Sequence, residues 1–544
     1  MNDSARSPIR VAELIGNRLA AAGVRYAFGI PGGEVLSLLD GLKMAGVEFI
    51  LCRHENCGGF MAEGTHHASG APAVLVATVG PGVANAVNVV VNAYQDRVPM
   101  LFLTGCIDEE DQHTYTHQIF DHQELLRGVT KASFRLNVAS LEEILDKALC
   151  IAFDGQRGPV HLDVPISVAK ARIDRPIPVR RAKIMATAPV DKEVTRLGAL
   201  LERARRPLIL AGLDVLAHRA ASELQSLAEL LGAPVLTTYK AKGVIPETHP
   251  LSLGGAGLSP RADAVLLPLV RKADVVVLAG YDPIEMRKGW RSPFREETAV
   301  IEISSVPNTH YVHQASCSVV GDIGATLRVL GQRVQKSAGP VWDCGSPESA
   351  RHSLAAAFAR ESVFGPARIS HALSELIPKH AFVSVDTGAH RIAFNQIYRV
   401  QSAGTLLQSS GLCTMGCAVP LAIGAKLAAP LRPAVAVTGD GGLEMALGEL
   451  ATLRDQRLSV VIVVYDDRSL ALIEMKQRHL GLSTLGVNSG GTDFVSIAAS
   501  FGGIGVLVED EETLRKAVCE ALAVEGRFSL LHCRLERASY DDLI

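Results

Sequence analysis

The stretch PAVAVTGDGGLEMALGELATLRDQRLSVVIVVYDDRSLALIEMKQ, residues 433–477, contains two short apolar runs, each followed by a polar loop. Runs of this length predict buried strands at 433–438 and 459–465. The leucine spacing between them predicts one helix over 443–457. A Gly-rich loop between a strand and a helix presents backbone N–H groups and the positive end of the helix dipole. The loop is therefore expected to bind phosphate.

Two carboxylates follow these strands. Asp440 lies in the loop Gly439-Asp440-Gly441-Gly442, and Asp467 comes 27 residues later, directly after the second strand. Neighbouring parallel strands would place both side chains at the carboxyl edge of the sheet, where open α/β sheets bind ligands. Mg²⁺ prefers one or two carboxylates together with phosphate oxygens and water. The loop alone is weak evidence, because most such strings are ordinary turns.

The composition restricts the class of protein. A chain of 544 residues, 48% apolar and 20% charged, is long enough for about three domains. Its apolar runs are too short to span a bilayer and the N-terminus is polar, so we expect a cytoplasmic protein without a membrane partner. The net charge of −3 argues against nucleic acid. Ten cysteines without CxxC spacing predict reduced thiols, not zinc or disulfides.

The rest of the chain repeats the alternation of apolar runs and amphipathic helices. This alternation predicts the α/β class, with parallel sheets covered by helices on both faces. Two non-periodic stretches, 172–189 and 335–348, are typical of linkers. We therefore expect three doubly wound parallel-sheet domains, at 1–180, 190–335 and 349–544.

The expected elements of the first two domains are short. In the first domain, helices are predicted at 11–22, 34–45 and 56–69, and a further helix after the loop 80–85 ends at Tyr94. Strands are predicted at 49–52, 74–78, 99–104 and 158–165, and the stretch 26–33 is predicted to turn from a strand into a Gly-rich loop. In the second, strands are predicted at 208–211, 233–236 and 275–278.

The spacing from Asp440 to Asp467, with a helix and an apolar strand between, resembles the diphosphate-binding signature of thiamine diphosphate-dependent enzymes. The chain departs from that signature because Asp466-Asp467 replaces the usual Asn-Asn. The resemblance implies that the side chains of Asp440 and Asp467 and the main-chain carbonyl of Ser469 bind Mg²⁺. It also implies that the loop glycines Gly439, Gly441 and Gly442 contact the diphosphate.

Further motifs are similar to those of acetolactate (acetohydroxyacid) synthases, and they occur in that family's order over almost the whole chain. In the first domain they are Arg53-His54-Glu55, Met61-Ala62-Glu63-Gly64, Gly80-Pro81-Gly82 with Asn85, Val129-Thr130-Lys131 and Gly158-Pro159-Val160. Later in the chain they are Thr237–Gly243 with His249-Pro250-Leu251, Val383–His390 and Ser409–Gly416. The resemblance implies pyrimidine-binding, central and diphosphate-binding domains. It further implies decarboxylation of a 2-oxo acid, with pyruvate as the expected donor, and ligation of the acyl unit to an acceptor.

The resemblance assigns the cofactor contacts. Glu55 matches the glutamate that hydrogen-bonds N1′ of the aminopyrimidine, and Met415 matches the residue that holds the cofactor in its bent form. Gly33, Pro81, Asn85, Gly388 and His390 match other cofactor-facing positions. Plainer alternatives stay open: a solvated glutamate at a strand end, a core methionine, and a histidine behind the site.

The acceptor side departs from the family pattern. Gln118 aligns with a glutamine near the substrate, but His117 replaces the usual phenylalanine and Lys476 stands where anabolic synthases carry a tryptophan. If Lys476 faces the site, its ammonium group together with His117 would favour an acceptor bearing carboxylate, sulfonate or phosphate. Lys476 could equally be a surface lysine. His113 and His117 would share a face on a helix, and we expect a structural or acceptor role there instead of a metal.

Residues 279–285, with Tyr281-Asp282-Pro283-Ile284, resemble the FAD-independent catabolic synthases, so FAD is not expected. In the family, the first and third domains of different subunits hold opposite ends of one cofactor, which implies a homodimer or homotetramer. Three alternatives remain. They are another lyase or acyltransferase with a different 2-oxo acid or an anionic acceptor, a flavin-dependent pyruvate oxidase, and a noncatalytic relative. The presence of Glu55, Asp440 and Asp467 argues against the last.

Overall fold

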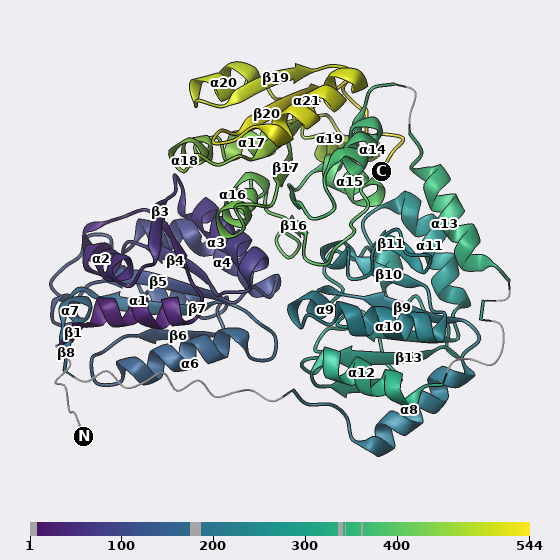
Figure 1. Cartoon of the computed structure of the whole chain (residues 1–544), viewed down its shortest axis with the longest axis horizontal. Helices are drawn as coiled ribbons and strands as arrows, with labels where there is room; N and C mark the ends of the chain where they lie inside the picture. Colours follow the sequence, from purple (N-terminus) through teal and green to yellow (C-terminus); the bar gives the residue numbers. More distant parts are fainter. Residues whose placement is uncertain (1–7, 175–185, 336–340, 343, 361–362) are drawn as a thin grey trace. The chain divides into compact units, whose positions relative to one another are not determined.

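The computed structural model describes residues 8–174, 186–335, 341–342, 344–360 and 363–544 (Figure 1). Within these residues the chain forms three six-stranded parallel sheets and one short antiparallel pair, β1 (Ile9–Arg10) with β8 (Arg172–Ile173). The predicted α/β class with three doubly wound sheets is confirmed. None of the described helices is both long enough and apolar enough to cross a membrane. Much of the two predicted linkers, namely 175–185, 336–340 and 343, lies outside the described residues.

The first sheet has the strand order β3-β2-β4-β5-β7-β6, with every pair parallel. Its central strands are buried along their whole length, as expected for a sheet covered on both faces. Successive residues of a strand point to opposite faces of the sheet. On β4, Val76 lies in the apolar core under α1, whereas its neighbour Leu75 lies beside α3, so helices cover both faces of the sheet. The strands are β2 (Tyr26–Gly29), β3 (Glu48–Leu51), β4 (Ala73–Ala77), β5 (Met100–Cys106), β6 (Ala132–Arg135) and β7 (Val160–Pro165). The helices are α1 (Val11–Ala21), α2 (Leu36–Met44), α3 (Glu55–Ser69), α4 (Pro81–Gln95), α5 (His122–Leu126), α6 (Leu141–Phe153) and α7 (Ile166–Lys170).

The second sheet has the order β11-β10-β9-β12-β13-β14. Two separate apolar clusters line its two faces, one under α8, α10 and α12 and the other under α11 and α13. The strands are β9 (Pro207–Ala211), β10 (Val235–Thr238), β11 (Ser252–Ala256), β12 (Val275–Ala279), β13 (Ala299–Ser304) and β14 (Cys317–Val320). The helices are α8 (Asp191–Arg203), α9 (Leu213–Ala217), α10 (Ala221–Leu231), α11 (Pro260–Lys272), α12 (Ile323–Arg333) and α13 (Ser346–Ala357).

The third sheet has the order β16-β15-β17-β18-β20-β19 and contains the stretch at 433–477. The two strands predicted there are direct parallel neighbours, with Gly439 beside Tyr465. The strands are β15 (Phe382–Val385), β16 (Leu406–Gln408), β17 (Ala434–Gly439), β18 (Val461–Asp466), β19 (Ile504–Val508) and β20 (Ser529–Arg534). The helices are α14 (Pro366–Leu376), α15 (Ala389–Ile397), α16 (Ala418–Ala428), α17 (Asp440–Met445), α18 (Glu449–Asp455), α19 (Ala471–His479), α20 (Phe494–Ser500) and α21 (Glu511–Ala523).

The single helix predicted over 443–457 is wrong. Helix α17 ends at Met445, residues 446–448 form a turn, and α18 begins at Glu449. The break has a packing reason, since the Glu449 carboxylate accepts hydrogen bonds from the backbone of residues 53 and 54. Gly448 also lies so close to Arg53 that an added Cβ would be 3.1 Å from the Arg53 Cβ.

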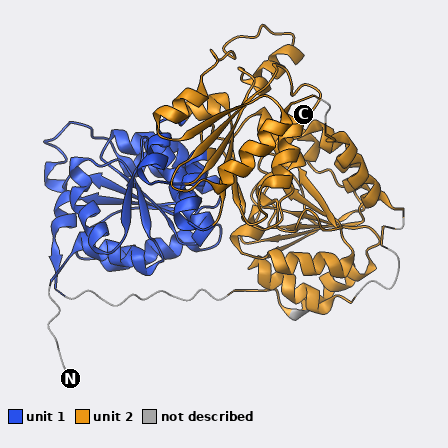
Figure 2. Ribbon diagram, turned by 45° about the horizontal axis from the view of Figure 1, so that its top comes forward, with its two compact units in different colours: residues 1–184, 419–431, 446–458 blue, residues 185–418, 432–445, 459–544 orange. Residues whose placement is uncertain are grey.

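The chain divides into two compact units (Figure 2). The first contains residues 1–184 together with 419–431 and 446–458, so most of α16 and the whole of α18 pack with the first sheet. Helices α16 and α3 meet backbone to backbone, because a Cβ on Gly424 would lie 1.9 Å from the Met61 carbonyl oxygen. Residues 419–431 and 446–458 thus pack in a unit made mainly of residues far earlier in the chain. The predicted domain boundaries at 180, 190, 335 and 349 stay a prediction.

Candidate functional site

A cavity of about 130 Å³ lies in the second unit, at the carboxyl ends of β15, β17 and β18. This is the edge at which open parallel sheets bind ligands. Nine residues predicted from the sequence line it, and they come from four separate segments of the chain. They are Gly388, His390, Met415, Gly439, Asp440, Gly441, Gly442, Asp467 and Ser469. The stretch at 433–477 therefore does form one wall of a pocket.

Close packing explains the glycines of this pocket. A Cβ on Gly442 would lie 2.8 Å from Asp386 Oδ2, and a Cβ on Gly388 would lie 2.7 Å from the His390 ring. Strand β17 ends at Gly439, and α17 begins at once with Asp440. The backbone N–H groups of the first turn of α17 therefore border the cavity.

The carboxylates of Asp440 and Asp467 lack the partners that a stable pair of buried anions would need. Burial raises the pKa of Asp440 to about 6, although Ser489 donates a hydrogen bond of 2.9 Å to its Oδ2. Burial and the neighbouring Asp440 charge raise the pKa of Asp467 to about 7. A divalent cation between the two groups would offset both effects.

Asp466 has a different environment from its neighbour Asp467. Burial raises its pKa, but a hydrogen bond of 2.6 Å from His532 Nε2 outweighs that effect, and the pKa lies below its usual value. The Asp466 carboxylate is therefore engaged on β20, away from the cavity. Of the two adjacent aspartates, Asp467 is the one available to a metal ion.

Three buried polar atoms of the cavity residues have no hydrogen-bond partner within the described chain: Thr387 Oγ1, His390 Nε2 and Asp467 Oδ2. Buried polar groups are nearly always satisfied, so three such atoms around one cavity indicate a polar ligand. Burial, together with the charge of Arg391, lowers the pKa of His390 to about 3, so its imidazole is neutral. These features fit a diphosphate with its metal ion.

Ser469 follows the carboxylates in a fixed loop. Its N–H donates to Asp467 Oδ1 at 3.3 Å and its hydroxyl donates to Glu474. Because the hydroxyl is engaged, the main-chain carbonyl of Ser469 is the group left for a cation, and its role as a metal ligand stays a prediction.

Glu55 lies in the first unit and is 4% exposed. It was expected at a strand end, but it is the first residue of α3. Asn85 Nδ2 donates a hydrogen bond of 3.0 Å to Glu55 Oε2. Glu449 accepts the N–H groups of Arg53 and His54, at 2.9 and 3.2 Å, and so fixes the two residues that precede Glu55.

The loop before α4 is tightly constrained. Gly80 has φ 71°, and a Cβ there would lie 2.3 Å from the Gln118 carbonyl oxygen. Gln118 itself has φ 60°, which is strained for a non-glycine residue, and such strain concentrates at functional sites. Pro81 is the first residue of α4, and Gly33 begins a short 3₁₀ turn.

The acceptor-side residues are exposed in this chain. His117 and Gln118 lie in a turn region, so His113 and His117 do not share a helix face. Lys476 is exposed on α19, whereas Leu472 and Ile473 of the same helix line the cavity.

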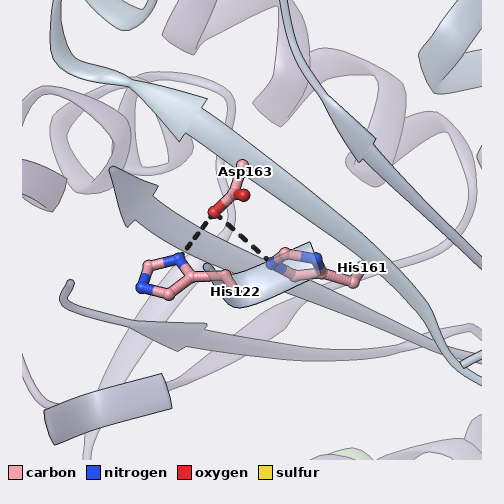
Figure 3. Close-up of side chains that lie close together, drawn as sticks. All are labelled: His122, His161 and Asp163. Carbon is pink, nitrogen blue, oxygen red and sulfur yellow. Dashed lines mark hydrogen bonds and ion pairs between the residues drawn. The ribbon is translucent and has the colours of Figure 1, made fainter. Parts of the chain in front are cut away.

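A buried polar network supports the loop that begins at Gly80. Figure 3 shows three of its side chains, His122, His161 and Asp163. Asp163 Oδ1 accepts from His122 Nδ1 at 2.8 Å and from the Thr104 hydroxyl at 2.7 Å. His122 Nε2 in turn accepts the Gly80 N–H at 3.3 Å. His161 Nε2 contacts the Thr104 hydroxyl at 2.7 Å. This network, which sequence reasoning missed, fixes the backbone from which α4 and Asn85 extend.

Asp386 is a second residue that sequence reasoning missed. Its carboxylate accepts the N–H groups of Thr387 and Gly416 and the Thr438 hydroxyl, and so joins β15, β17 and the loop carrying Met415. Burial raises its pKa to about 6 despite these bonds. No strand was predicted before Asp386, so the sequence carried no separate signal for this role.

Comparison with known families matches three models described for thiamine pyrophosphate enzymes. The N-terminal TPP binding domain matches residues 9–125, the central domain 194–330, and the C-terminal TPP binding domain 386–533. These matches agree with the three sheets.

Curated relatives cover nearly the full chain. It is 31% identical to "Probable acetolactate synthase large subunit" of Methanocaldococcus jannaschii, over 90% of this chain and 86% of that protein. It is 28% identical to "Acetolactate synthase" of Bacillus subtilis, over 95% and 92%. It is also 28% identical to "Acetolactate synthase isozyme 1 large subunit" of Escherichia coli, over 98% and 95%. The resemblance inferred from the motifs is confirmed.

Proposed function

The chain belongs to the thiamine pyrophosphate enzymes. We propose that it decarboxylates a 2-oxo acid, with pyruvate as the donor, and ligates the acyl unit to an acceptor. This proposal agrees with the name acetolactate synthase that its relatives carry. The observation that carries the proposal is the cavity, in which a glycine loop, two carboxylates and three unpartnered polar atoms meet. The cofactors are thiamine diphosphate and Mg²⁺.

The residues of the second unit bind the anionic end of the cofactor. Asp440, Asp467 and the carbonyl of Ser469 hold the Mg²⁺ ion. The backbone of Gly439, Gly441 and Gly442, together with Gly388 and His390, receives the diphosphate, and Met415 supports the rings. When bound, thiamine diphosphate supplies the nucleophilic carbon and accepts the electrons released on decarboxylation.

The residues of the first unit act on the aminopyrimidine. Glu55 moves a proton at its carboxylate, and Asn85 holds Oε2 of that carboxylate in place. Gly33 and Pro81 would border the ring of the bound cofactor. Because Glu55 and the cavity belong to different compact units, the proposal includes a homodimer or homotetramer in which the two ends of a cofactor come from different subunits.

The chemical class of the acceptor is proposed from the polar and charged side chains at positions 117, 118 and 476. At positions 117 and 476, where the family carries aromatic side chains, this chain has an imidazole and an ammonium group, and Gln118 follows His117 in the sequence. These groups favour an anionic acceptor, such as a second 2-oxo acid, and keep open a related lyase or acyltransferase. Tyr281-Asp282-Pro283-Ile284 supports an enzyme that needs no FAD.

The test is incubation of the purified protein with thiamine diphosphate, Mg²⁺ and pyruvate, with products identified by mass spectrometry. We expect acetolactate and CO₂, both dependent on the two cofactors, and little of either from the Asp467→Ala variant. Parallel reactions with other carboxylate, sulfonate, phosphate or uncharged acceptors distinguish the alternatives. Release of CO₂ without acetolactate, but with a different ligation product, would support the second candidate. No CO₂ from pyruvate or other 2-oxo acids would overturn the proposal, and flavin absorbance in the protein would contradict its FAD-independent part.

A further inference from the structure

A cluster of two histidines and a glutamate lies at one edge of the second sheet, apart from the proposed cofactor site. Glu302 is on β13, while His310 and His313 lie in the connection from β13 to the edge strand β14. Each side chain offers one ligand atom, and these atoms lie within 4.8 Å of one another. Glu302 and His313 are 2% and 3% exposed, whereas His310 is half-buried and reaches solvent.

The distances fit a metal ion bound between these groups. His313 Nε2 and Glu302 Oε1 are 3.0 Å apart. Two tetrahedral zinc ligands, each about 2.0–2.1 Å from the ion, lie about 3.3 Å from each other. Asn308 and Ser318 donate hydrogen bonds to the two Glu302 oxygens, at 2.9 and 3.0 Å. They orient the carboxylate as neighbours of metal ligands commonly do.

The second histidine cluster of the described chain makes an informative contrast. Around His122, His161 and Asp163, every ring nitrogen has a partner, with Gly80 and Ser133 completing the set. That cluster is satisfied without a ligand. In the cluster at Glu302, His313 Nδ1 is buried and has no hydrogen-bond partner within the described residues. The His313 ring is thus only partly satisfied by protein partners, and its Nε2, which faces Glu302 Oε1 at 3.0 Å and Asn308 Nδ2 at 3.4 Å, is the nitrogen placed for the ion.

We propose that Glu302, His310 and His313 bind one divalent transition-metal ion of the zinc type. Two imidazoles and a carboxylate are a recognised zinc set, and water from the solvent side of His310 would fill the fourth position. The ion would fasten the connection between β13 and β14 to the edge of the sheet. The cysteine spacing that argued against zinc does not bear on this site, because its ligands are histidine and glutamate.

The test uses the full chain, with the proposed cofactor site saturated by excess Mg²⁺ and thiamine diphosphate. After chelator treatment and its removal, Co²⁺ is titrated by visible absorption and Zn²⁺ by competition. We expect one equivalent bound, with the visible bands of a nitrogen-ligated cobalt site. The His313→Gln and Glu302→Gln variants should each lose at least about 100-fold in affinity.

A matched control is available in the same domain. His218 contacts Asp322 at 3.3 Å, also as a histidine–carboxylate pair, and among the described residues this pair is not part of a cluster of three possible metal ligands. His218→Gln should keep wild-type Co²⁺ binding. Far-UV circular dichroism checks that each variant is folded, and Zn²⁺ should raise the Tm of the wild type but not of His310→Gln. Wild-type protein that binds no Co²⁺ at micromolar concentrations, or His313→Gln and Glu302→Gln variants with unchanged affinity, would overturn the proposal.

Discussion

Two adjacent aspartates at the end of β18 have opposite environments. His532 engages Asp466, whereas one buried oxygen of Asp467 has no hydrogen-bond partner among the described residues, and Asp467 lies beside Asp440. We expect Asp467→Ala to weaken thiamine diphosphate binding by about 100-fold or more at ordinary Mg²⁺, because a metal ligand is lost. Higher Mg²⁺ should restore part of the affinity. Calorimetric titration of the cofactor at fixed Mg²⁺ measures the effect.

Two variants serve as controls. Asp467→Asn keeps an oxygen ligand and introduces the residue usual in the family, so it should be tolerated. Asp466→Asn should lower stability through its bond to His532 but leave the Mg²⁺ dependence of binding unchanged. A reversed pattern, with Asp466 controlling Mg²⁺ dependence, would show that the metal ligand is misassigned.

Lys476 is the residue on which the choice of acceptor depends most. It is exposed on α19, one turn beyond the cavity residues Leu472 and Ile473. If its ammonium group recognises an anionic acceptor, Lys476→Met should raise the acceptor KM about 10-fold or more and leave donor decarboxylation unchanged. Initial rates at varied acceptor concentration, with CO₂ release measured in parallel, test this.

Lys516 on α21 is another lysine of the second unit, and its Lys516→Met variant controls for loss of one positive charge. Equal effects of Lys476→Met on both half-reactions, or no effect on either, would place Lys476 outside the acceptor site.

The pocket residues were predictable because their signals are local. Gly439 to Gly442 and Asp467 follow buried strands at a fixed spacing, and parallel strands bring such ends together. Asp386 and Glu449 were not predictable in the same way. Their partners lie tens to hundreds of residues away, as in the contact of Glu449 with the backbone of Arg53, and one sequence carries no signal for such pairs.

At the scale of elements, α4 and β7 are joined by the network of His122 and Asp163. Burial raises the pKa of Asp163, but hydrogen bonds from His122 and His161 outweigh it and hold the pKa well below its usual range. A carboxyl group with a depressed folded pKa contributes stability above its unfolded pKa of about 3.9, and loses that contribution as the pH falls further. Asp163→Asn should therefore lower the free energy of unfolding by about 2 kcal/mol at pH 7.

The pH dependence gives the sharper test. The difference between wild type and Asp163→Asn should stay constant from pH 7 to about pH 5 and shrink below about pH 4. Urea unfolding at several pH values measures it. The exposed pair of Arg10 and Asp40 in the same unit is the matched control, and Asp40→Asn should change stability little. A difference that grows as the pH falls would contradict the assigned charge of Asp163.

The helices show where sequence periodicity fails. Leucine spacing alone predicted a continuous helix through 443–457, yet the chain turns at 446–448. Periodicity reports which face of a helix is apolar but not which body it packs on. Here α17 borders the cavity, whereas α18 packs in the first unit. The apolar residues of one continuous sequence pattern therefore belong to two different compact units.

At the scale of the whole molecule, the proposed catalytic glutamate and the proposed metal site belong to different compact units. If each active site combines Glu55 of one subunit with Asp467 of another, two inactive variants should complement each other. Mixing Glu55→Gln with Asp467→Ala, after dissociation and reassociation, should regain about a quarter of wild-type activity, because half of the random dimers then contain one intact site.

Each variant alone, carried through the same procedure, is the control and should stay inactive. Absence of recovery, with mixed dimers demonstrated by mass spectrometry, would mean that Glu55 and Asp467 act within one subunit.

The most direct test of the central claim, that this chain activates thiamine diphosphate through Glu55, is hydrogen–deuterium exchange at C2 of the bound cofactor, followed by NMR after rapid acid quench. The wild-type protein with Mg²⁺ should exchange this proton far faster than free cofactor does. Glu55→Gln should bind the cofactor with similar affinity but exchange it about 100- to 10,000-fold more slowly, because its amide cannot relay the proton. Exchange in Glu55→Gln at the wild-type rate, or no acceleration by the wild type, would contradict the account.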